Sequence, residues 1–114
     1  MRIEEIVHLI NGKVISGKAF LNKTIENGFA SDLMSDVLTL DSDDIILITG
    51  LSNMQVIRTA EMSDIACVIV ARNKNVSEQM VKLADDCDIV IIKSSCTVFK
   101  VVGELYKNGI KPIY

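Results

Sequence analysis

Three short apolar runs divide the second half of the chain, and each is followed by a polar turn and then by a helical pattern. The runs begin at residues 45, 66–67 and 89, about 22 residues apart. They are apolar without alternation, which is typical of strands covered on both faces in a parallel sheet. Segments 54–62, 77–86 and 97–107 carry apolar residues at helical spacing and would form the connecting helices. The pattern predicts a small layered α/β domain with a mostly parallel sheet, in two or three layers.

The first 40 residues are predicted to add two helices and one or two edge strands to this sheet. Residues 2–10 have helical spacing and end at Asn11-Gly12, a pair that favours a left-handed helix end. Residues 13–17 and 24–30 are predicted as short extended segments at the sheet edges. Ser31 is predicted to cap a helix that ends near residue 40, with Asp32 in its first turn.

Length, composition and charge limit the classes of partner. With 114 residues, 49% hydrophobic and 24% charged, the chain is expected to be a single domain over residues 1–114. Its net charge is −3 and its 12 basic residues are scattered, so no nucleic-acid partner is expected. The apolar runs are far shorter than the roughly 20 residues of a membrane span, and the acidic start is unlike a signal peptide. We therefore expect a cytoplasmic protein with no membrane contact.

The three cysteines, Cys67, Cys87 and Cys96, have neither the number nor the spacing of a disulfide framework or a metal site. We expect no cofactor and no bound metal. Cys96 precedes a predicted helix and lies near Lys93 in sequence, which favours a reactive thiol. The only histidine, His8, is in the first helix, and nothing in the sequence brings it near Cys96 as a catalytic partner.

Polar residues follow the predicted strands and would gather at one edge of the sheet. Ligands of parallel sheets bind outside the carboxyl ends of the strands, where helix amides and the helix dipole favour anions. Arg72, Lys74 and Lys93 would add positive charge there, so a small anion or a nucleotide is the expected ligand. The candidate ligand-binding residues are Ser31, Asp32, Thr49, Gly50, Ser52, Asn53, Arg72, Ser94, Ser95 and Thr97.

Simpler explanations compete with a ligand site at this edge. Ser52, Asn53 and Thr97 are also ordinary helix caps, which occur with or without a ligand. Neither a Walker loop nor a G-x-G-x-x-G motif follows any strand. Asp32 and Asp36 would share one helix face and suit acid–base chemistry or a divalent ion, but a solvated face with a contact to the helix dipole is the favoured explanation. No catalytic residue is assigned.

The last predicted helix has a broader apolar surface than one sheet face requires. Phe99 and Tyr106 widen the stripe formed by Val98, Val102 and Leu105. Such breadth is typical of a contact between copies of a small domain, and a homodimer is expected. Burial of this surface by the N-terminal segment is the alternative.

Three segments resemble the DRTGG-domain family. They are residues 28–38 (GFASDLMSDVL), residues 46–50 (ILITG) and residues 99–109 with their GELY motif. The resemblance implies a fold similar to the N-terminal domains of HPr kinase/phosphorylase and of the MurF ligase. It also implies a regulatory or dimer-forming module, alone or attached to CBS domains, phosphotransacetylases or pyrophosphatases. The five-letter motif that names the family is absent from this chain.

The leading hypothesis is a non-catalytic regulatory module that dimerises and senses a small anion or nucleotide at the strand ends. One alternative is a small enzyme acting on a phosphorylated metabolite, with Ser94, Ser95, Asp32 or Asp36 near a phosphate held by the Gly50 and Thr97 amides. Another is an interaction subunit of a larger metabolic or redox complex, with a protein partner that the sequence leaves unknown.

Overall fold

The computed structural model describes residues 1–114, and its helices and strands alternate in the predicted order. The elements are α1 (Ile3–Leu9), β1 (Gly12–Ser16), the short 3₁₀ helix η1 (Lys18–Phe20), β2 (Asn27–Ala30), α2 (Met34–Val37), β3 (Ile45–Thr49), α3 (Met54–Met62), β4 (Cys67–Val70), α4 (Glu78–Asp86), β5 (Val90–Ser94), α5 (Val98–Lys107) and β6 (Lys111–Pro112).

The six strands form one sheet in the order β1-β5-β4-β3-β2-β6. All neighbouring pairs are parallel except β1 with β5, which is antiparallel. The predicted mostly parallel sheet is therefore confirmed. β1 is an edge strand as expected, whereas β2 lies inside the sheet because β6, which the sequence pattern did not reveal, pairs with its outer side.

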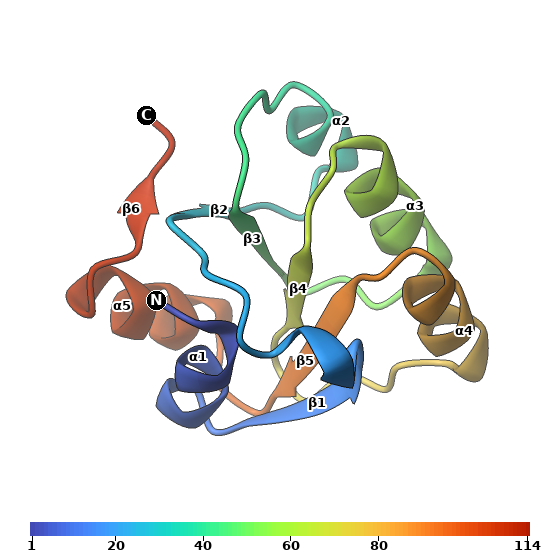
Figure 1. The fold of residues 1–114 in the computed structure, drawn as a ribbon, viewed down its shortest axis with the longest axis horizontal. Helices are drawn as coiled ribbons and strands as arrows, with labels where there is room; N and C mark the ends of the chain where they lie inside the picture. The colour runs from blue at the N-terminus through green and yellow to red at the C-terminus, as the bar shows by residue number, and fades with distance from the viewer.

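Helices cover both faces of the sheet, so the domain has three layers (Figure 1). α1 and α5 lie on one face, and α2, α3 and α4 lie on the other. Successive residues of one strand face opposite layers: Ile46 packs toward α1 and α5, while Leu47 packs toward α3 and α4. This is why the strand sequences are apolar without alternation.

The prediction of a helix from Ser31 to about residue 40 is wrong. The structure has only the four-residue helix α2 there, and its N-cap is Leu33. The Ser31 amide donates to the Ile48 carbonyl at 3.1 Å and so continues the ladder between β2 and β3. Its hydroxyl accepts from the Leu33 amide at 3.0 Å in a local turn. Asp32 is therefore not on a helix, and it does not share a helical face with Asp36.

None of the helices is both long and apolar enough to pass through a bilayer. The cytoplasmic location stays a prediction.

Candidate functional site

Asp32 joins the ends of β2 and β3 at the carboxyl edge of the sheet. Its Oδ1 accepts from the Thr49 hydroxyl at 2.9 Å and from the Gly50 amide at 2.7 Å. Hydrogen bonds to a charged acceptor are stronger than neutral ones, so this contact anchors the turn after β3. A β-carbon at Gly50 would lie 3.4 Å from Asp32 Oδ2, which places the second carboxylate oxygen alongside the glycine. Three of the predicted site residues thus meet at one point.

The turn after β4 brings Arg72 to the same point. Arg72 and Asn73 have φ angles of 67° and 54°, in the left-handed region that non-glycine residues adopt rarely. The conformation is held by the turn's own amides: Arg72 donates to the Cys96 carbonyl and Asn73 to the Ser94 carbonyl, each at 2.8 Å.

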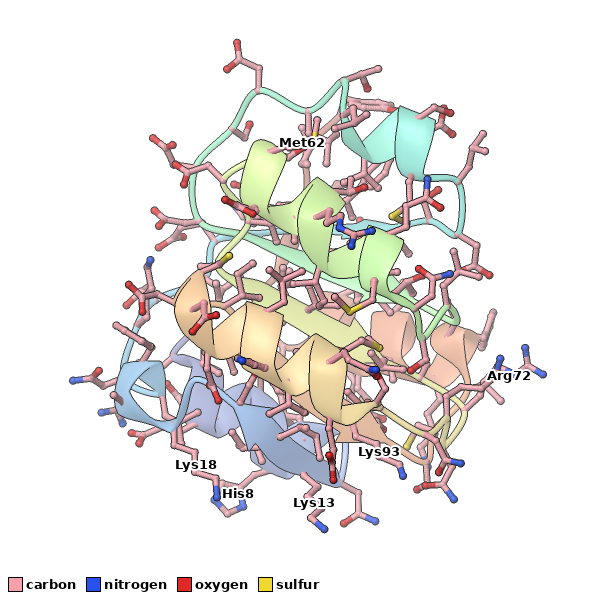
Figure 2. All side chains as sticks on the ribbon, turned by 90° about the vertical axis from the view of Figure 1, so that its right-hand side faces the viewer. His8, Lys13, Lys18, Met62, Arg72 and Lys93 are labelled. Carbon is pink, nitrogen blue, oxygen red and sulfur yellow. The ribbon has the colours of Figure 1, made fainter.

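The Arg72 Cδ would lie 3.9 Å from a β-carbon at Gly50, so the stem of this side chain runs beside the β3 turn. Figure 2 shows the side chain reaching outward from this edge. Arg72 forms no ion pair with Asp32, because both ion pairs of the chain belong to Arg2. Its guanidinium is therefore available to an anion.

Capping explains two of the other candidates. Asn53 Oδ1 accepts from the Val56 amide at 3.2 Å at the start of α3, and Thr97 Oγ1 accepts from the Lys100 amide at 3.2 Å at the start of α5. Ser52 is not a cap.

The Ser52 hydroxyl donates to the Asn75 carbonyl and also approaches Met80 Sδ at 3.6 Å. It ties the turn after β3 to the turn after β4.

Ser94 is turned into the protein. It is 1% exposed, and its hydroxyl donates to the Ile10 carbonyl at 2.7 Å and accepts from the Cys96 amide at 3.1 Å. Buried polar groups that have their partners stabilise a fold, and this one links β5 to the end of α1. Ser94 is therefore unavailable as a nucleophile or as a ligand contact, while its neighbour Ser95 is exposed.

The cysteines do not form a reactive centre with histidine. The Cys96 thiol lies 3.5 Å from the Ile10 carbonyl oxygen, and no hydrogen bond joins it to the exposed His8. Burial raises the pKa of the Cys67 thiol, and burial followed by the Glu61 carboxylate raises the pKa of Cys87. A raised pKa keeps a thiol protonated and unreactive.

The apolar face of α5 is open to solvent. Phe99 is 88% exposed and Tyr106 is 66% exposed, so the alternative that the N-terminal segment covers these two side chains is wrong. They border a shallow hollow of about 540 Å³, lined by Val98, Phe99, Val102, Gly103, Tyr106 and Lys107. A smaller hollow beside it continues past Val102 and Tyr106 to the β2 and β6 edge of the sheet.

The amino ends of the central strands, opposite the carboxyl edge, form an acidic surface. A polar hollow of about 440 Å³ is lined by Lys23, Asp43, Asp44, Asp64, Ile65, Ala66, Cys87 and Asp88. These aspartates belong to three turns that are far apart in the chain, and the topology of the sheet brings them together. No group of three or more histidine, cysteine or acidic side chains is arranged to hold a metal ion.

Lys13 reaches the carboxyl edge although the sequence did not place it there. β1 runs antiparallel to β5, so the start of β1 lies beside the end of β5. The signal that would have revealed this is the direction of an edge strand, which a five-residue pattern does not carry.

No protein-family model matches the chain, and no curated protein matches it either. Among solved structures, it is similar to the CBS and DRTGG domains of the regulatory region of a Clostridium perfringens pyrophosphatase, crystallised with the activator diadenosine tetraphosphate. The TM-score is 0.74 at 14% sequence identity, and the alignment covers 98% of this chain. It covers 48% of the other chain, so the present chain spans about half the length of that structure.

A likeness at this identity is evidence for the fold alone. It agrees with the expectation raised by residues 28–38 and 46–50, and the predicted resemblance is confirmed at that level. The chain therefore has a DRTGG-like α/β fold.

Proposed function

We propose that this chain is a non-catalytic regulatory module that associates with a second copy of itself through α5 and binds a small anion, such as a nucleotide, at the carboxyl edge of the sheet. The open apolar face of α5 is the observation that carries the proposal, because a surface of this kind marks an interaction site. The structural neighbour supports it, since that region is regulatory and was crystallised with a nucleotide activator.

Phe99 and Tyr106 are large enough to anchor an interface. Burying one such side chain contributes about 1.5–3 kcal/mol, so the four in a symmetric dimer would contribute about 6–12 kcal/mol. Association itself costs an estimated 4–15 kcal/mol. The two ranges overlap, so these four side chains roughly offset the cost of association, and a stable dimer requires further contacts, for which the adjoining hollow at the β2 and β6 edge offers a surface.

Sedimentation velocity at tens of micromolar tests the dimer. The Phe99→Glu variant places a charge in the centre of the face and should be monomeric. Met62→Glu is the matched control, because Met62 is 72% exposed but lies at the end of α3, on the other face of the sheet (Figure 2). A wild-type chain that sediments as a monomer, or a dimer that Phe99→Glu leaves intact, would contradict this part of the proposal.

The anion site is proposed at the Arg72 guanidinium, beyond the point where the stem of its side chain passes Gly50, because the Gly50 amide itself is already bound to Asp32. The Arg72 guanidinium has no carboxylate partner, and the backbone hydrogen bonds of the turn hold the Arg72 main chain at this edge. A ligand that binds the native state at a hundred times its Kd stabilises it by about 2.7 kcal/mol. Thermal unfolding with a panel of nucleotides should therefore reveal a ligand as a rise in Tm.

Arg72→Gln should remove that rise, and Arg58→Gln is the matched control, since Arg58 is an exposed arginine in α3. Equal responses of the two variants would show that the ligand does not bind at Arg72. If the purified wild type is a monomer but co-purifies with a different protein from its own cells, that result supports the interaction-subunit hypothesis instead of the homodimer.

A further inference from the structure

Two lysines face each other across neighbouring strands at the carboxyl edge of the sheet. Lys13 of β1 and Lys93 of β5 are direct partners in the antiparallel register. Directly opposite residues in such a pair point to the same face, with β-carbons about 4.5–5.5 Å apart. Figure 2 shows both side chains at the same margin of the molecule, below α4.

Neither charge is neutralised within the protein. The ion pairs of the chain both involve Arg2, so no carboxylate partners Lys13 or Lys93. Glu78, in the first turn of the overlying α4, does not pair with either. Like charges directly opposite one another destabilise a sheet, so this pair weakens the fold unless an anion lies between the two ammonium groups.

The lysine pair continues the positive edge that begins at Arg72. The turn after β4 lies over the end of β5, because the Asn73 amide donates to the Ser94 carbonyl at 2.8 Å, next to Lys93. Val70 of β4 and Lys13 of β1 are the partners of Lys93 on its two sides. From β4, where the Arg72 backbone lies, to β1 the track crosses two strand spacings, about 10 Å, and a third spacing, to about 15 Å, where the Arg72 side chain extends toward the end of β3.

The two ends of the sheet thus carry opposite charge. The amino edge carries the acidic hollow at Asp43, Asp44, Asp64 and Asp88. In a chain of net charge −3, the other edge carries four cations, Arg72, Lys74, Lys93 and Lys13, against two carboxylates, Asp32 and Glu78, so it is positive by two charges. Such a separation attracts anions to the positive edge and repels them from the other.

We infer that Lys13 and Lys93 bind a chain of two or more linked phosphates that extends from Arg72 across the end of β5. This inference rests on the proposed anion site and names its ligand class. A single phosphate spans too short a distance to contact both Arg72 and Lys13, whereas a linear phosphate chain lies along the track.

Titration calorimetry with inorganic phosphate, pyrophosphate and tripolyphosphate tests the inference. Tripolyphosphate should bind the wild type most tightly, and Lys13→Gln or Lys93→Gln should each weaken it by about tenfold, the effect of losing one charge-assisted hydrogen bond. Lys18→Gln is the matched control, because Lys18 follows the far end of β1. An equal loss in Lys18→Gln would mean unspecific attraction and would overturn the inference.

The outcomes separate this inference from the proposed function. If Arg72→Gln abolishes binding and the two lysine variants do not, the track is wrong and the Arg72 site stands. If none of the three phosphates nor any nucleotide binds the wild type, both are wrong.

A double-mutant cycle on Tm gives a second measurement that does not require a measured affinity. Without phosphates, Lys13→Gln should raise Tm when Lys93 is present and leave it unchanged in Lys93→Gln. With excess tripolyphosphate, Lys13→Gln should lower Tm. If the coupling between Lys13 and Lys93 has the same sign with and without tripolyphosphate, the two lysines do not bind the anion. Their role would then be to keep the edge strand β1 from pairing with other chains.

Discussion

Replacing Asp88 by glycine should stabilise the protein, because glycine adopts the backbone conformation of this position at a lower cost. Asp88 follows the C-cap of α4 and has a φ of 57°. The next amide, of Ile89, donates to the Ala84 carbonyl at 2.8 Å and closes the helix end. α5 ends in the same way but has Gly109, at a φ of 104°, in the equivalent place.

The size of the effect follows from three favourable terms and one that opposes them. Left-handed backbone costs a residue with a β-carbon about 1–2 kcal/mol, and a carboxylate at a helix carboxyl end costs about 0.3–1 kcal/mol. The neighbouring aspartates of the acidic hollow add repulsion. Against these, glycine gives the unfolded chain more freedom, worth about 0.5–1 kcal/mol. We expect Asp88→Gly to raise the free energy of unfolding by about 0.3–2.5 kcal/mol.

Urea unfolding of Asp88→Gly and Asp88→Asn separates the terms. The asparagine variant removes only the charge, so it should gain about 0.3–1 kcal/mol, and that gain should shrink in high salt. Asp41→Gly is the control, because Asp41 is exposed and does not have a positive φ. A destabilised Asp88→Gly alongside an unchanged Asp88→Asn would refute the backbone term. A destabilised Asp88→Asn would refute the charge term.

Three further outcomes are expected. Ser94→Ala should lower the free energy of unfolding by about 1–3 kcal/mol, measured in urea, because the hydroxyl that donates to the Ile10 carbonyl at 2.7 Å is lost from a buried site. Asp32→Asn should cost about 1–2 kcal/mol by weakening the charged acceptor of the Gly50 amide, and an unchanged midpoint would mean that this contact adds nothing. Burial raises the pKa of the Cys67 thiol, so above about pH 8.5 the unfolded chain loses a proton that the folded chain keeps, and stability falls as pH rises. Cys67→Val should make that fall less steep in unfolding curves between neutral and alkaline pH, and identical slopes would contradict the assignment.

The elements with strong periodicity were predicted closely. α3 was expected over residues 54–62 and is observed as Met54–Met62. Its apolar spacing, its cap at Asn53 and its buried residues all favour the same local structure. β6 was missed because two residues with a proline have no periodicity of their own. They become a strand only because β2 presents an unpaired edge to them.

The candidate ligand edge was predicted in outline and altered in its details. The convergence of the turns after β2, β3 and β4 follows from parallel strands, and it places Asp32, Gly50 and Arg72 together. The orientation of each side chain was beyond the sequence. Ser94 and Ser95 are adjacent and chemically identical, yet one is buried and the other exposed, because alternate residues of a strand end face opposite directions.

The sequence by itself determined the alternation of buried strands and helices, and with it the layered α/β class, because hydrophobic spacing is a local property that each segment carries independently. Only the tertiary structure decided which charges meet. The direction of β1 brings Lys13 opposite Lys93, and the start of each central strand adds an aspartate to one acidic hollow. Electrostatic contacts depend on distances between residues far apart in the chain, and these exist only once the sheet order and register are set.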